Sequence, residues 1–153
     1  MRRLARPLVV AVVATVATSA AAIDVKLRNG WLRPTYAGQS TAMVYVDIES
    51  TEPLTLVAAH SPVAKAAQLV LVDPPGPDTE PKVVTELPVT AKQLTRLALL
   101  GNHLRLLDVQ QDLAAGARVP LELTFVDSKG KRMSAKTEAV IRGIVAHRPE
   151  KSN

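Results

Sequence analysis

The most informative segment for the fold is Asn102-His103-Leu104-Arg105-Leu106, in which polar and apolar side chains alternate. Successive side chains of a β-strand point to opposite faces of a sheet. The two leucines therefore belong to a buried face, and His103 and Arg105 lie together on the other face. The alternation predicts a half-buried strand that begins near His103.

Comparable runs recur about every ten residues along the chain, and none keeps a helical period for longer than about two turns. The nine predicted strands are Ile23–Arg28, Ala42–Ile48, Leu54–Ala59, Gln68–Val72, Lys82–Leu87, Leu94–Leu99, His103–Val109, Val119–Asp127 and Met133–Ile141. Turn residues mark the breaks, which include Asn29-Gly30, Pro34, Gly38, Gly101-Asn102, Ala115-Gly116 and Ser128-Lys129-Gly130. One helical turn is expected at Ser61–Ala67, because Pro62 follows a serine cap. The pattern predicts an all-β fold of two packed sheets.

The N-terminus has the pattern of a secretory signal peptide. Three arginines precede the apolar run Leu8–Ala17, and small residues follow it up to Ala22. The apolar run is shorter than the roughly 20 residues that a membrane-spanning helix needs. We expect cleavage after residue 22, with an uncleaved anchor as the alternative. Residues 23–144 are then the single domain, and residues 145–153 a polar, flexible tail.

Charge and composition exclude several classes of function. The formal net charge is +5, but it falls to +2 once the three leader arginines are removed. Nucleic acid is therefore not an expected partner. The chain has no cysteine, so thiolate nucleophiles and zinc–thiolate or iron–sulfur sites are excluded. Phosphate-binding loops and serine-hydrolase elbows are also missing, and we predict that the protein is not an enzyme.

Three segments resemble a known family, the periplasmic copper chaperones of the PCu(A)C type. The main one is Gly101-Asn102-His103-Leu104-Arg105-Leu106-Leu107, followed by similar stretches at 112–116 and 119–125. Gly30-Trp31-Leu32-Arg33-Pro34 resembles the family's Trp-x-Arg signature, and Leu54–Ala64 resembles its Ser-Pro-x-Ala segment. The similarity extends from Val25 to Val140. It implies a single cupredoxin-like, Ig-like antiparallel β-sandwich of about nine strands.

The resemblance also implies a copper site with a degenerate ligand set. The family motif is a His, a Met after ten intervening residues, and a His-x-Met pair after twenty-one more. Counting back from His103 places Val70, Pro81, His103 and Arg105 in the four ligand positions, so only His103 is retained. Copper(I) prefers thioether and imidazole donors, whereas a guanidinium stays protonated and repels cations. His103 is the tentative metal ligand.

Other donors could complete this site. His60 is a weak candidate, if the strand that begins at Leu54 ends near His103. Met43 is expected to fill a gap in the core, and Met133 to pack on a half-exposed strand. A Ser61–His103–Asp47 arrangement could be assembled, but any chain with a few such residues permits one.

Two readings of function follow. In the first, the protein is an exported, periplasmic copper-chaperone-like protein that helps to metallate the copper centre of a respiratory oxidase, with copper as its cargo. In the second, it is a metal-free β-sandwich binding or structural module that has lost the copper site, in which Arg105 and His103 grip a carboxylate or another anion.

Overall fold

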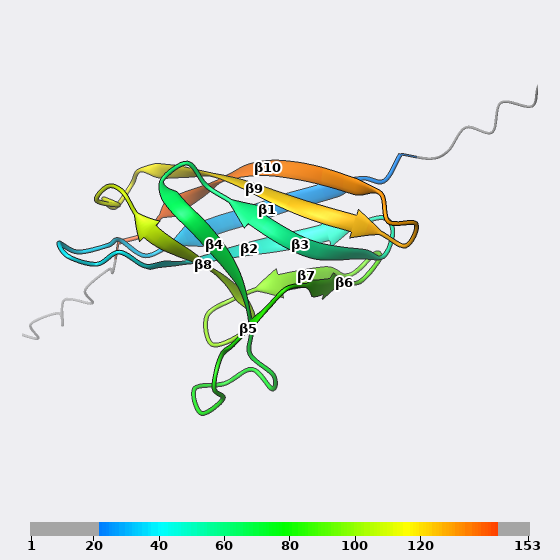
Figure 1. Ribbon diagram of the computed structural model, residues 1–153, viewed down its shortest axis with the longest axis horizontal. Helices are drawn as coiled ribbons and strands as arrows, with labels where there is room; N and C mark the ends of the chain where they lie inside the picture. Colours follow the sequence, from blue (N-terminus) through cyan, green and yellow to red (C-terminus); the bar gives the residue numbers. More distant parts are fainter. Residues whose placement is uncertain (1–21, 144–153) are drawn as a thin grey trace, which may run out of the picture.

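The computed structural model describes residues 22–143, which form ten strands joined by turns and loops (Figure 1). The strands are β1 (Val25–Leu32), β2 (Ala42–Ser50), β3 (Leu54–His60), β4 (Ala64–Leu71), β5 (Lys82–Val84), β6 (Leu87–Val89), β7 (Leu94–Leu97), β8 (His103–Val109), β9 (Arg118–Asp127) and β10 (Arg132–Ile141). No helix occurs within residues 22–143, and hence none there that could cross a membrane. The all-β prediction is confirmed.

The strands form one continuous, strongly curved sheet that nearly closes on itself. Its order is β5-β4-β8-β2-β1-β10-β9-β3-β6, and β7 extends β8 along the edge of β2. Figure 1 shows β4, β8, β2 and β1 wrapping around toward β10, β9 and β3, which form the opposite layer. Pairing is antiparallel throughout these strands except between β1 and β10, which run parallel.

Three sequence predictions about local structure were wrong. Asn29-Gly30 is not a turn: β1 continues through it with a register shift against β2, and Asn29 takes a positive φ of 53°. Gly30 is needed there because a Cβ atom would lie 3.1 Å from the Glu138 carbonyl oxygen of β10. Most of the expected helical turn at Ser61–Ala67 is the start of β4, since pairing with β8 outweighs the local preference for a turn.

The third error is the predicted strand Lys82–Leu87, because the structure has two short strands there, β5 and β6. β5 pairs with β4, whereas β6 pairs with β3 on the other layer, so the chain must cross between layers at Thr85-Glu86. The predicted signal peptide over residues 1–22 and the predicted tail over residues 145–153 fall almost wholly outside the described residues.

The inner faces of the two layers meet in one apolar core. Its fully buried members come from both layers and include Leu32, Val44, Leu104, Leu123 and Phe125. Burial of one such side chain stabilises the fold by about 1.5–3 kcal/mol. Because the core takes every second residue of β1, β2 and β8, the intervening residues must lie on the outer face of the sheet.

A second buried group lies on that outer face. Tyr45, Val70, Val72 and His103 are all buried, yet none belongs to the core cluster. They alternate with core residues along β2, β4 and β8. The fold therefore creates a separate buried environment around His103.

Candidate functional site

The register of the strands aligns the outer-face residues in two neighbouring rows. The first row contains Val83 of β5, Val70 of β4 and His103 of β8, which are successive register partners. It continues to Tyr45 of β2, whose ring centroid lies 6.2 Å from that of His103. Trp31 of β1 is the register partner of Tyr45 and extends the row.

His103 is fixed in this row by a hydrogen bond to its own turn. Its side chain is only 5% exposed, and its Nδ1 lies 2.9 Å from the carbonyl oxygen of Gly101. Because a carbonyl oxygen can only accept, Nδ1 carries the proton. In the neutral ring, Nε2 then carries a lone pair, and this atom is buried without a hydrogen-bond partner among residues 22–143. Metal-ligating histidines are commonly held in this way, with the second ring nitrogen donating to a backbone carbonyl.

The turn before β8 is held by hydrogen bonds to both the side chain and the backbone carbonyl of Asn102. The Asn102 side-chain oxygen accepts a hydrogen bond from the Val72 amide at 2.9 Å. The Asn102 backbone carbonyl accepts one from the Ala98 amide at 2.8 Å. The Leu100 carbonyl accepts one from Gly76 of the proline-rich loop at 2.8 Å. Leu100 itself has a positive φ of 61°, a strained conformation for a leucine. The carbonyl that orients His103 is therefore part of a constrained turn.

The aromatic residues of the first row, Tyr45 and Trp31, contact the Met43 thioether and the Arg142 guanidinium. The Tyr45 hydroxyl donates a hydrogen bond to the Met43 sulfur at 3.7 Å. Trp31 stacks on Tyr45 with centroids 4.5 Å apart, and the Arg142 guanidinium lies 5.3 Å from the centre of the Trp31 ring. Burial raises the pKa of Tyr45, and the nearby positive charge of Arg33 partly offsets that rise.

The second row lies one step further along the strands and is more polar. Met43 of β2 and Gln68 of β4 are both register partners of Arg105 on β8. Met43 is 45% exposed, so the expectation that it fills a gap in the core is wrong. Met43 lies on the outer face of β2 because its neighbours Ala42 and Val44 occupy the core positions.

Three of the four positions given by the copper motif lie on the neighbouring strands β4 and β8. Val70 is the direct register partner of His103, and Arg105 follows two residues later on the same face of β8. Pro81 is exposed and immediately precedes β5. Val70 and Pro81 offer no side-chain donor atom, and Arg105 forms no ion pair with any residue in 22–143. These four positions therefore supply one donor atom, His103 Nε2, and not a complete copper(I) site.

The other candidate residues lie elsewhere. His60 is exposed at the end of β3, opposite Glu122 of β9, and lines a hollow of about 240 Å³ whose lining does not include His103. The Ser61 hydroxyl donates to the Pro120 carbonyl at 2.7 Å, and the Asp47 carboxylate accepts from Arg96 at 3.1 Å. Neither forms a hydrogen bond with His103. Met133 is partly buried against the core, as expected.

Two further hollows lie near β1 and β2. One, of about 270 Å³, is lined by residues that include Trp31, Asp47, Arg96 and Arg142, and it adjoins the aromatic end of the first row. The other, of about 350 Å³, lies around Asp24 and Glu49 at the far end of both strands. No group of three or more His, Asp or Glu side chains within residues 22–143 could hold a metal ion.

Some functional features had no signal in the sequence. The stacking of Trp31 on Tyr45 and the sulfur bond of Met43 depend on the register between β1, β2 and β8. That register is set by long-range pairing, which a single segment does not encode. Of these outer-face features, strand alternation in the sequence predicts that His103 and Arg105 share one face.

Comparisons with known proteins point to one family and one fold. Residues 25–137 match the family model described as LpqE-like, a lipoprotein family. No curated protein matches the chain. Among solved structures, a copper-bound PCuAC domain from PmoF2 matches with a TM-score of 0.61 at 17% identity, over 78% of this chain and 92% of that chain.

Two other solved structures give similar values. The apo PCuAC domain from PmoF1 has a TM-score of 0.59 and 24% identity, and the match covers 78% of this chain and 93% of that one. The solution structure of CuI-DR1885 from Deinococcus radiodurans has a TM-score of 0.60 and 20% identity, over 78% and 79% of the two chains. At these identities the likeness establishes a shared fold.

Proposed function

Because the chain belongs to the LpqE-like family and shares the fold of PCuAC domains, we propose that it handles copper, with His103 Nε2 as its metal-binding atom. One observation carries the proposal: this nitrogen is buried, bears a lone pair in the neutral ring and has no hydrogen-bond partner in the part of the chain that the structure describes. An unpaired buried acceptor costs about 1–3 kcal/mol, and a bound metal ion would remove that cost.

The proposed role is to pass copper on rather than to store it. A single imidazole cannot complete the coordination of copper(I), which takes further soft donors. The missing donors come from the protein that gives or receives the ion, and the proposed recipient is the copper centre of a respiratory oxidase. Copper is thus a cargo, and the chain is a binding protein, not an enzyme. We propose that it acts in the periplasm after export through the signal sequence at residues 1–22.

A metal-free binding module is the alternative function. The observation that favours it is Arg105, whose positive charge stands two residues from His103 where the copper motif has a methionine. A fixed guanidinium disfavours a cation nearby and suits an anion. The two functions differ in whether copper binding depends on His103.

A copper(I) titration distinguishes them. The full chain is titrated without oxygen, under reducing conditions, against a weakly binding chromophoric competitor. We expect one equivalent to bind with roughly micromolar affinity, which corresponds to about −8 kcal/mol. His103→Ala should weaken this binding at least tenfold, whereas the matched variant His60→Ala should leave it unchanged. Equal binding by wild type and His103→Ala would reject the proposal and favour the metal-free module.

A further inference from the structure

Three arginines lie around the exposed Met43 on the outer face, and we call these four residues the basic row. Met43 and Arg105 are register partners. Arg33 follows Leu32, the last residue of β1, whose register partner on β2 is Val44, the neighbour of Met43. Arg142 follows the end of β10, where its amide donates to the Leu32 carbonyl at 2.9 Å. The basic row therefore crosses four adjacent strands, in the order β10, β1, β2 and β8.

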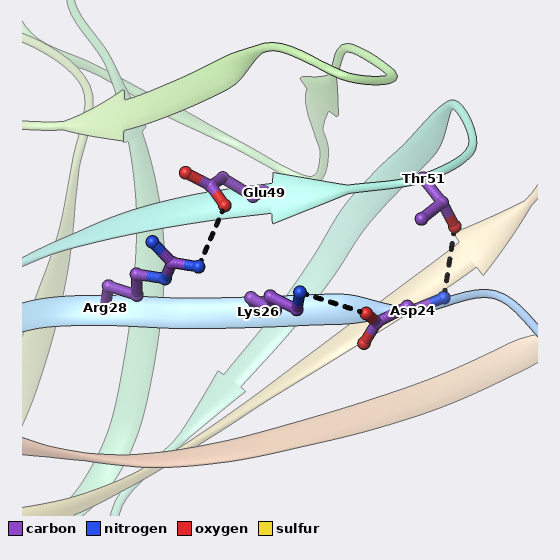
Figure 2. Close-up of polar contacts among 5 residues, drawn as sticks. All are labelled: Asp24, Lys26, Arg28, Glu49 and Thr51. Carbon is purple, nitrogen blue, oxygen red and sulfur yellow. Dashed lines mark hydrogen bonds and ion pairs between the residues drawn. The ribbon is translucent and has the colours of Figure 1, made fainter.

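The arginines of the basic row have no acidic partners among residues 22–143, whereas the charges at the opposite end of β1 are paired. There, Lys26 lies 3.4 Å from Asp24, and Arg28 lies 3.5 Å from Glu49 (Figure 2). None of the five ion pairs in the described part of the chain includes Arg33, Arg105 or Arg142. Positive charge is thus paired with carboxylates at one end of this sheet layer and has no acidic partner among residues 22–143 at the other, where Arg142 lies over the Trp31 ring.

The dimensions of the basic row do not suit a small anion. Neighbouring strands are about 4.8 Å apart, so three strand steps separate the backbone of Arg142 from that of Arg105 by roughly 14 Å. A single carboxylate pairs bidentately with one guanidinium group, so it cannot pair in this way with all three arginines along such a row. Several carboxylates spaced along a chain can do so. Met43 at the centre adds an apolar contact, and Met and Arg are both enriched in protein interfaces.

We propose that the basic row is a docking surface for an acidic segment of a partner protein. Guanidinium groups bind carboxylates through paired hydrogen bonds, and an uncompensated positive patch accelerates encounter with an acidic partner. This surface borders His103 but does not require copper. The proposal therefore stands or falls separately from copper binding.

The test measures binding of a fluorescein-labelled hexaglutamate peptide to the full chain by fluorescence anisotropy, without copper. The test variant is Arg33→Glu/Arg142→Glu, since both side chains are exposed. The matched control is Lys129→Glu/Arg132→Glu, which makes the same charge change at two exposed residues, in the turn between β9 and β10 and at the start of β10. Circular dichroism checks that each variant is folded, and His103→Ala is measured in parallel.

At 20 mM salt we expect the test variant to bind the peptide at least tenfold more weakly than wild type, and the control less than threefold more weakly. His103→Ala should bind as wild type does. Raising the salt to 150 mM should weaken binding to wild type. No binding at 20 mM salt, or equal losses in the test and control variants, would overturn the proposal. Displacement of the peptide by inorganic phosphate at constant ionic strength would instead indicate a small-anion site and would also overturn it.

Discussion

The pKa of the Tyr45 hydroxyl depends on the positive charge of Arg33. Burial raises the pKa of Tyr45 and Arg33 partly offsets the rise, so Arg33→Gln should raise this pKa further. The chain has two tyrosines, and Tyr36→Phe leaves Tyr45 as the only one. In that background, ultraviolet absorbance against pH measures the titration directly. Lys129→Gln is the control and should not move it. An unchanged or lower midpoint in Arg33→Gln would show that Arg33 does not act on Tyr45.

Sequence alone could identify His103 and Arg105 as neighbours on one face, because strand alternation requires it. It could not show that His103 is buried, since the residues that pack beside it come from β2 and β4, which are distant in sequence. It also could not assign the proton to Nδ1, which depends on the Gly101 carbonyl. Burial and tautomer are properties of tertiary contacts and not of a segment.

At the scale of strands, Gly30 is the position that lets β1 pass close to β10. Gly30→Ala places a Cβ atom 3.1 Å from the Glu138 carbonyl oxygen and 3.2 Å from the Ala139 Cα, both backbone atoms that cannot easily move. Overpacking of this kind costs about 1–3 kcal/mol, and urea denaturation should show that loss. The control Lys26→Ala, exposed on the same strand, should change stability by less than about 0.5 kcal/mol. A loss no larger than in the control would mean that β1 and β10 can separate there without cost.

The ligand positions on β4, on β8 and just before β5 can be tested by restoring the ligand side chains. The variant Val70→His/Pro81→Met/Arg105→Met supplies one imidazole and two thioethers at the other three motif positions, and it removes a positive charge. We expect copper(I) binding to tighten at least 100-fold, or by about 2.7 kcal/mol. Arg105→Lys keeps the charge and should bind no more tightly than wild type. A folded triple variant with wild-type affinity would show that these positions do not converge.

Most of the strands were predictable because each one carries its own alternation. β8 has the predicted bounds, His103–Val109, and β2, β3, β9 and β10 differ from prediction by two residues or fewer at each end. The errors occurred where pairing partners decide the structure. Asn29-Gly30 has the composition of a turn but continues a strand, because β1 is held between β2 and β10.

For the molecule as a whole, the buried Tyr45 hydroxyl predicts a loss of stability at alkaline pH. A pKa raised in the folded state above the ordinary value of 10.0 stabilises the fold at lower pH. This contribution is lost as the pH rises from about 10 through the folded-state pKa. Urea midpoints measured between pH 8 and 11 should fall, and the fall should be smaller in Tyr45→Phe. An equal fall in that variant would assign the pH dependence to other groups.

The central proposal is that this chain, which shares the fold of PCuAC domains, binds metal through one atom, His103 Nε2, on the outer face of its sheet. Long-range proton–nitrogen correlation spectra of the ¹⁵N-labelled full chain resolve its three histidines separately. The claim predicts that His103 carries its proton on Nδ1, and that one equivalent of copper(I) shifts the His103 Nε2 signal while the other two histidines stay unchanged. A proton on Nε2 in the copper-free protein, or copper-induced shifts only at the other histidines, would contradict it.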